Sequence, residues 1–228
     1  PPPKNIRMKG LEIKDYIFPR QTPYGPFSWG VATSSFQNEG GGGKTDWEHW
    51  PPYQKREHNY PGFTEEDIKL AAELGITTIR TSIEWTLVEP EEGKFDEQAM
   101  KYFIQQLQWM KKYSIDPCVN LWHFTLPDWV AKKGGIENDS FPLWFGRFAR
   151  YVAMQCKKRN LRIKWWMTMN EPTVFVAKGY IYGAWPPQQR LALHKLLYFE
   201  HIIINAHRKA YRELHKILDV KNQKIMVG

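Results

Sequence analysis

The sequence predicts an α/β fold built on a parallel sheet, because short apolar segments typical of buried strands alternate with longer amphipathic segments typical of helices. No hairpin turn joins one strand segment to the next, so crossover helices must return the chain and the strands must run parallel. A doubly wound dinucleotide-binding sheet would need G-x-G-x-x-G before a helix, and no helix follows the glycine run at 40–43. We therefore expect a (β/α)8 barrel, of which this chain holds about the first four strand–helix units and the start of the fifth strand.

The first two strands flank a helix with recognisable ends. Residues 27–36, FSWGVATSSF, predict the first strand. A helix should begin after Thr64, which with Asp67 nearly matches a capping box, and Gly75 should close it. The β-branched residues at 76–85, ITTIRTSIEW, predict the second strand.

The rest of the chain repeats this alternation. Asp96 should open a long helix that ends near Tyr113, with Phe103, Leu107 and Met110 on one apolar stripe. The elements expected after it are a strand at 115–124, a helix at 141–160, a strand at 164–172, a helix at 191–218 and the start of a strand at 224–228.

The strand at 164–172, KWWMTMNEP, ends in an asparagine, a carboxylic acid and a proline. Pro172 cannot donate a ladder hydrogen bond and disfavours the right-handed helical region for Glu171, so the strand should stop there and leave the acid extended. Among the tryptophans and methionines of this run the carboxylate would be poorly solvated, which would suit Glu171 to act as a general acid. The alternative is a strand-end glutamate that pairs with a nearby arginine.

Composition excludes several classes of protein. With 228 residues, 42% of them hydrophobic and 25% charged, the chain is typical of a globular protein, and we expect residues 1–228 to form part of one domain. The formal net charge is +8, but the basic residues lie scattered beside acids, which argues against a nucleic-acid partner. The aromatic residues make up 15% of the chain; their rings can stack against sugars or bases, or simply fill a core.

Neither a membrane span nor a secretion signal is expected, because the sequence has no apolar run of about 18 residues and no apolar segment near its start. Cys118 and Cys156 lie far apart and lack metal-ligand spacing. We expect them to be free thiols, in a reduced, cytoplasmic setting and without a metal or cofactor.

Five blocks of sequence, in this order, resemble successive signatures of glycoside hydrolase family 1, the β-glucosidase family: FSWGVATSSFQNEG, IRTSIEW, NLWHFTLPDW, TMNEP and GYIYGAWPP. The resemblance implies a (β/α)8 barrel that hydrolyses terminal β-D-glycosides with retention of configuration. It covers nearly the whole chain but only about the first half of the family's domain. The family's nucleophile lies in a T-E-N-G motif at the end of the seventh strand, and TENG does not occur here.

The resemblance also implies roles for individual residues. Glu171 matches the acid/base, and Asn170 matches the side chain that binds the sugar 2-hydroxyl. Gln37 and His123 match the positions that hold the 3- and 4-hydroxyls, since an amide and a neutral imidazole each offer a donor and an acceptor. Arg80 matches the arginine that binds the nucleophilic carboxylate.

Other aromatic residues extend the expected site. Phe124 and Thr125 replace the Trp-Asp pair frequent in the family, which keeps an aromatic wall and removes an acid. Tyr180 and Trp185 are candidates for the aglycone side, or they simply cover the barrel mouth. For His123, the alternative to a sugar-binding role is a hydrogen-bonded core histidine, and the surrounding motif NLWHFTLP argues against that alternative.

Glu84 needs a separate interpretation, because many family members have serine there. Alternation along a strand would place Arg80, Ser82 and Glu84 on one face, so Glu84 could point inward and resemble a second catalytic carboxylate. We expect it instead to pair with a neighbouring arginine.

Three functions remain open. The chain is the N-terminal half of a retaining β-glycosidase, or a catalytically silent half-barrel that acts only by pairing with another half, or a relative such as an endo-β-glucanase of the same barrel clan. Gln37, His123 and the first-strand block argue against the last. The expected partners are a small β-glycoside or oligosaccharide and the C-terminal half of the barrel, and an open barrel edge should also favour self-association.

Overall fold

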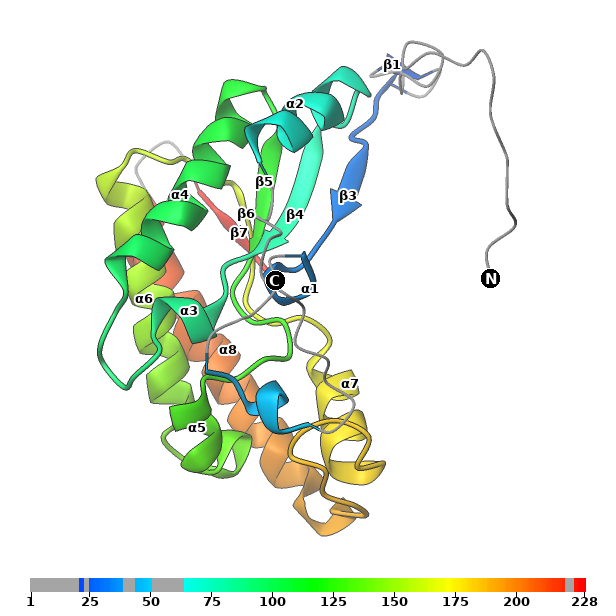
Figure 1. Ribbon diagram of the computed structural model, residues 1–228, viewed down its shortest axis with the longest axis vertical. Coiled ribbons are helices and arrows are strands. Elements are labelled where there is room, and N and C mark those ends of the chain that lie inside the picture. The colour runs from blue at the N-terminus through cyan, green and yellow to red at the C-terminus, as the bar shows by residue number, and fades with distance from the viewer. Residues whose placement is uncertain (1–20, 23–24, 39–43, 51–63, 220–223) are drawn as a thin grey trace.

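The computed structural model describes residues 21–22, 25–38, 44–50, 64–219 and 224–228. Its main sheet is parallel and has the strand order β3-β4-β5-β6-β7 (Figure 1). These strands are β3 (Gly30–Ala32), β4 (Thr78–Ser82), β5 (Asp116–Asn120), β6 (Trp165–Met167) and β7 (Met226–Val227). Each strand pairs with the next one along the chain, whereas a doubly wound sheet reverses direction at a switch point. The sequential order confirms the predicted barrel architecture.

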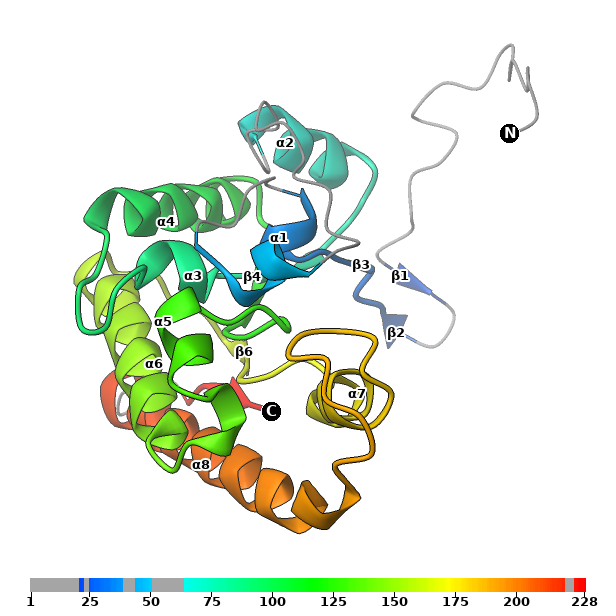
Figure 2. The ribbon, with the colours of Figure 1, turned by 60° about the horizontal axis from the view of Figure 1, so that its bottom comes forward.

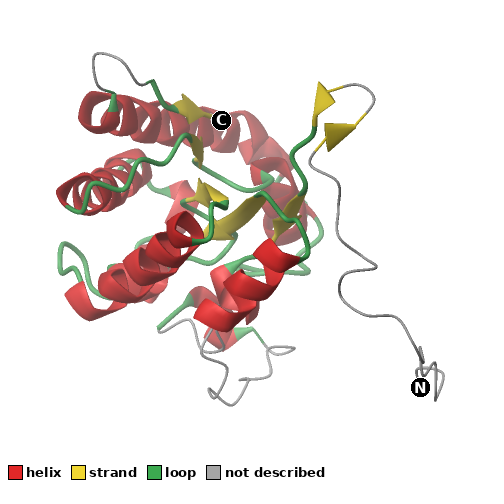
Figure 3. Ribbon diagram, turned by 90° about the horizontal axis from the view of Figure 1, so that it is seen from above, coloured by secondary structure: helices red, strands yellow, loops and turns green. Residues whose placement is uncertain are grey.

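The crossover helices form a layer outside the strands. They are α2 (Glu65–Glu73), α4 (Glu97–Lys112), α6 (Phe141–Lys158) and α8 (Leu196–Leu218). Figure 2 shows them as an arc around the sheet, and Figure 3 shows the strands inside this layer. The predicted caps are confirmed: Thr64 and Asp67 form a capping box at α2, and Asp96 accepts hydrogen bonds from two backbone amides at the start of α4.

The core lies between the outer face of the sheet and the helices. Ile79, Val119 and Trp166 alternate onto this face and are at most 2% exposed. The apolar stripe predicted for α4 packs against them, with Phe103 1% exposed. The opposite, inner face carries a row of register partners that runs from Arg80 through Cys118 and Trp165 to Met226; all four are at least partly exposed.

The strands are shorter than the sequence predicts, because each apolar run continues past the sheet into the rim at the carboxyl ends of the strands. Short helices begin there, below the strands in Figure 1: α1 (Ser35–Asn38), α3 (Trp85–Val88), α5 (Asp128–Lys132) and α7 (Pro172–Val176). The structure adds elements that no sequence pattern predicts. They are the single turns Asp46–His49 (η2), Gly135–Glu137, Ala177–Ile181 and Leu193–Lys195, and the small antiparallel pair Gln21–Thr22 and Gly25–Pro26.

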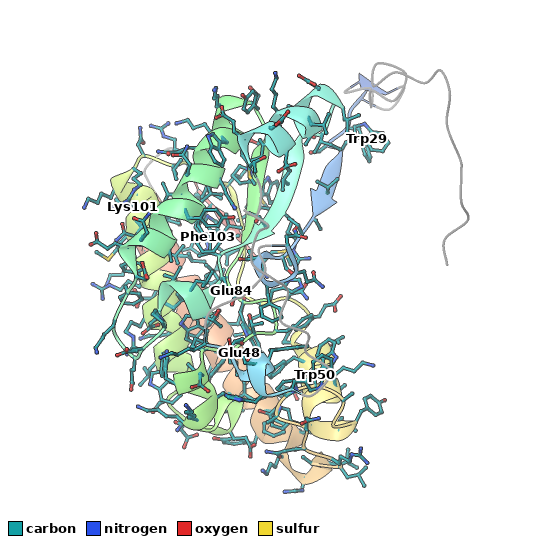
Figure 4. All side chains as sticks on the ribbon, in the orientation of Figure 1. Trp29, Glu48, Trp50, Glu84, Lys101 and Phe103 are labelled. Atoms are coloured by element: carbon teal, nitrogen blue, oxygen red, sulfur yellow. The ribbon has the colours of Figure 1, made fainter. Side chains whose placement is uncertain are left out.

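Glu84 corrects one expectation. The strand β4 ends at Ser82, so alternation does not carry Glu84 onto the inner face; instead it caps α3 and is 3% exposed (Figure 4). Its Oε1 accepts hydrogen bonds from the hydroxyls of Thr125, at 2.7 Å, and Thr86, at 3.0 Å. Glu84 therefore joins the rim after β4 to the rim after β5.

Three further findings concern membrane spans, cysteines and metal ligands. None of the helices that the structure describes is long and apolar enough to cross a membrane. Cys118 and Cys156 are free thiols. Within the described ranges, no three His, Cys, Asp or Glu side chains are grouped as metal ligands.

Candidate active site

The rim at the carboxyl ends of the strands is held together by backbone hydrogen bonds that continue beyond the sheet. The amide of Ile83 donates to the carbonyl of Asn120 at 3.0 Å, and the amide of Asn170 donates to the carbonyl of Trp122 at 2.9 Å. The segments that follow β4, β5 and β6 therefore lie side by side. Three of the residues predicted to bind a sugar, His123, Phe124 and Asn170, fall on these segments.

Arg80 and Asn170 are in direct contact, although 90 positions separate them in the sequence. The guanidinium of Arg80 donates to Oδ1 of Asn170, which leaves the amide NH2 of Asn170 to donate elsewhere. The Nε of Arg80 is buried, and it has no hydrogen-bond partner among the described residues. A buried guanidinium N–H calls for an acceptor, and a carboxylate is the acceptor that arginine binds best.

His123 follows β5 and is kept neutral by its surroundings. Burial is the main cause that lowers its pKa to about 4, and the nearby positive charge of Arg80 adds to the effect. The Nδ1 of His123 lies 3.4 Å from the side-chain amide nitrogen of Asn120, which can only donate. His123 Nδ1 is then the acceptor, so Nε2 carries the hydrogen and can donate to a hydroxyl.

Glu171 differs from its expected conformation. It is not extended: its φ of 42° and ψ of 57° are left-handed, because Pro172 begins α7 directly after it. Its carbonyl accepts hydrogen bonds from Val174 and Phe175, at 2.9 and 3.1 Å. The side chain is exposed rather than enclosed by tryptophan, since Trp166 points into the core on the outer face. A left-handed non-glycine residue costs about 1–3 kcal/mol, and such residues cluster at active sites.

The other predicted residues at the rim are a single amide, Gln37, and two aromatic residues, Phe124 and Trp185. Gln37 is exposed on α1, and its Oε1 accepts a hydrogen bond from Ser34 at 2.7 Å. The ring of Phe124 lies 4.9 Å from that of His123 and 5.0 Å from that of Trp185, and both Phe124 and Trp185 are partly exposed.

Tyr180 is buried, unlike Phe124 and Trp185. It is 1% exposed and packs against Phe175 and Phe199, because it lies in a helical turn against α8 rather than in a loop. Burial raises the pKa of its hydroxyl. Two residues at or near the rim, Asn120 and Trp47, were not singled out from the sequence. Asn120 could have been found from its position, because it stands three residues before His123 in the block NLWHFTLPDW.

Sequential parallel strands, with polar side chains gathered where they end, define the (β/α) barrel proteins that bind small molecules at the carboxyl ends of their strands. The family model of glycosyl hydrolase family 1 matches residues 19–228, which is most of the chain. The chain therefore belongs to glycosyl hydrolase family 1.

Individual relatives agree with this assignment. A 1,4-β-D-glucan glucohydrolase of Thermotoga neapolitana is 29% identical over 217 residues, covering 87% of this chain and 49% of the relative. A 6-phospho-β-galactosidase of Clostridium acetobutylicum is 30% identical over 209 residues, covering 86% of this chain and 43% of the relative. The structure of a β-glycosidase from Pyrococcus horikoshii superposes with a TM-score of 0.77 at 33% identity, covering 93% of this chain and 48% of that one. The chain thus spans about half the length of the curated relatives that it matches.

Proposed function

We propose that the chain is the N-terminal part of the catalytic barrel of a retaining β-glycosidase that hydrolyses terminal β-D-glycosides. The observation that carries the proposal is the Arg80–Asn170 hydrogen bond, next to the strand-end acid Glu171 in the family's TMNEP block. Family membership and the names of the relatives support a β-glycoside substrate.

In the proposed mechanism Glu171 is the general acid that protonates the leaving oxygen, and it later acts as the base that activates water. The NH2 of Asn170, oriented by Arg80, donates to the sugar 2-hydroxyl. Neutral His123, together with Gln37, holds the other hydroxyls of the glycone. Phe124 and Trp185 supply aromatic surface on the aglycone side.

Retention requires a second carboxylate about 5 to 5.5 Å from the first. Glu84 is a poor candidate, because its Oε1 already accepts hydrogen bonds from Thr86 and Thr125 and it caps α3. We propose that the nucleophile comes from the remaining strands of the barrel, where the buried Nε of Arg80 would bind it. The 228-residue chain alone should then be inactive.

The C-terminal half of the barrel is the proposed partner, and the two outer strands of the sheet support this proposal. Val31 on β3 is 43% exposed and Met226 on β7 is 51% exposed. A further strand beside each of these outer strands would bury such apolar side chains. Apolar edge strands favour pairing, so self-association is expected where the other half is absent. The family match gives no support to the endo-β-glucanase alternative.

The test is to co-express the chain with the C-terminal half of a similar β-glycosidase and to compare wild type with Glu171→Gln. An alkyl β-glucoside needs protonation of its leaving group, so its kcat/KM should fall about 10²–10⁴-fold. A dinitrophenyl β-glucoside needs little protonation and should lose far less in the glycosylation step.

Glu200→Gln is the matched control, since Glu200 is an exposed acid on α8. Equal losses on the two substrates in Glu171→Gln, or a similar loss in the control, would remove the assignment of Glu171. Turnover of an aryl β-glucoside by the purified 228-residue chain alone would overturn the proposal that the nucleophile lies elsewhere.

A further inference from the structure

The segment that carries His123 is irregular and contains a strained residue. It connects the end of β5 to the start of α5. Phe124, next to His123, has a φ of 74°, in the left-handed region. For a non-glycine residue this conformation costs about 1–3 kcal/mol and persists only where the surrounding structure holds it. The place of the His123 ring therefore depends on the contacts that hold the residues after Phe124.

Two buried carboxyl groups hold the two residues that follow this strained position. The hydroxyl of Thr125 donates to Oε1 of Glu84 at 2.7 Å. The amide of Leu126 donates to Oδ1 of Asp46 at 2.8 Å. Glu84 follows β4, below the sheet in Figure 4, and Asp46 begins η2. The segment after β5 is thus anchored to two other segments of the chain.

The two anchors differ in how many bonds support them. At the first, the amide of Asp46 also donates to the carbonyl of Leu126 at 3.1 Å, and Thr45 and Pro127 form a β-bridge beside it. Losing one of these bonds would leave the others in place. At the second, the side chain of Thr125 reaches Glu84 through its hydroxyl. A single substitution can therefore remove the second anchor.

The identity of residue 84 indicates what its carboxylate is for. Glu84 caps α3, but the preferred helix caps are Ser, Thr, Asp and Asn, whose short side chains reach the first amides. The bond from the Thr86 amide to Glu84 is long, at 3.4 Å, whereas the bond from Thr125 is 2.7 Å. Burying a carboxyl group costs free energy, and Glu84 is 3% exposed. A helix cap alone does not account for it.

We propose that Glu84 is a positioning residue for the candidate active site. By accepting the hydrogen bond from Thr125 it holds Phe124 in its left-handed conformation, and this fixes the place of the His123 ring. Glu84 itself does not touch the sugar, so its effect on binding passes through His123. This inference rests on the proposed function, in which His123 holds a hydroxyl of the glycone.

The test compares two hydroxyls that donate to the same oxygen of Glu84. Thr125→Val removes the hydroxyl on the segment of His123, whereas Thr86→Val removes the one on α3 and is the matched control. Both threonines are at most 2% exposed, so the two substitutions change equally buried positions. Thr125→Ser keeps the hydroxyl and should behave like wild type.

The first readout is the state of the His123 ring in the 228-residue chain, observed by nitrogen-15 NMR and assigned with His123→Gln. Wild type should show one neutral tautomer, with its hydrogen on Nε2, from about pH 5 to pH 8, because its pKa is lowered to about 4. In Thr125→Val the ring should show a mixture of tautomers, and its pKa should rise towards 6.5, so that it titrates in this range. Thr86→Val should give the wild-type signal.

The second readout is turnover by the co-expressed pair of halves. Thr125→Val should lower kcat/KM for an alkyl β-glucoside about tenfold, a loss that corresponds to about 1.4 kcal/mol. In His123→Ala the same substitution should cost nothing further, because its effect passes through the missing ring. A purely structural effect would instead add to the loss from His123→Ala.

An unchanged His123 signal in folded Thr125→Val, an equal change in Thr86→Val, or additive losses in the double variant would overturn the inference. If Thr125→Val does not fold, Thr125→Ala removes the same hydroxyl and decides the matter. The NMR readout needs no turnover. A pair of halves without activity would therefore count against the proposed function, while the His123 signal would still decide whether Glu84 positions the ring.

Discussion

The carboxyl group of Asp46 should make the stability of the fold depend on pH in an unusual direction. Burial raises its pKa from 3.8 to about 7, against the lowering effect of its hydrogen bonds from Leu126 and Thr45, and the negative charge of Glu84 raises it further. Between these two pH values the folded state therefore holds a proton that the unfolded state has lost. The contribution of Asp46 to stability is complete below pH 3.8 and is lost as the pH rises to about 7.

The size of the effect follows from the shift in pKa. One unit corresponds to about 1.36 kcal/mol, so between pH 5 and pH 7 Asp46 should lower the free energy of unfolding by roughly 2 kcal/mol. Asp46→Asn keeps an acceptor for the Leu126 amide and removes the titration. The free energy of unfolding of wild type relative to Asp46→Asn should therefore fall by roughly 2 kcal/mol across this range.

The assay is urea unfolding followed by tryptophan fluorescence at pH 5, 6 and 7. His123 should act in the opposite direction, because its lowered pKa means that the unfolded state binds more protons, so stability rises from pH 4 towards pH 6.5. In wild type the opposite effects of Asp46 and His123 on the free energy of unfolding partly cancel. In Asp46→Asn only the His123 effect remains, so the free energy of unfolding should rise with pH. Parallel curves for wild type and Asp46→Asn would refute the idea that Asp46 is buried with a raised pKa.

Three further substitutions test the packing that supports the rim. Arg147→Met should destabilise the fold by about 3 kcal/mol in urea unfolding, because it strips the ion pair from the fully buried Glu89, and adding Glu89→Gln should recover part of the loss. Gly179→Ala would place a Cβ 2.7 Å from the backbone oxygen of Pro186, so thermal unfolding should show a loss of about 1–3 kcal/mol, and an unchanged Tm would contradict this packing. Thr64→Ala removes the side-chain half of the capping box on α2 and should cost about 1 kcal/mol by chemical denaturation, whereas Thr64→Ser should cost almost nothing.

The long helices could be predicted closely from the sequence because their ends carry local signals. Asp96 caps α4 through its own carboxylate, and the apolar stripe through Phe103 requires a helical period. The strand positions were also predictable, but not their ends. An apolar run such as residues 115–124 serves both the strand and the buried rim, and the sequence does not mark where one becomes the other.

The candidate site could be predicted only where the family's motifs link residues that lie far apart in the sequence. The contact between Arg80 and Asn170 depends on strand order, which the resemblance supplied and periodicity could not. Glu84 was misplaced because α3, at four residues, is too short to show a helical pattern. The burial of Tyr180 could not be predicted, because it depends on Phe199 of α8, which folds back from later in the chain.

The sequential order of the strands also implies how the molecule opens. Because β5 is flanked on both sides while β3 contacts only β4 within the described sheet, amide hydrogen exchange should be slowest in β5 and quicken outward along the strand order. The residues of β3 are exposed, whereas Val119 on β5 is fully buried, so the segment leading to Gln37 would detach before the centre of the sheet opens. The proposed glycone site would then lose the Gln37 amide while Arg80 and Asn170 stayed hydrogen-bonded, and the rim would open strand by strand rather than in one step.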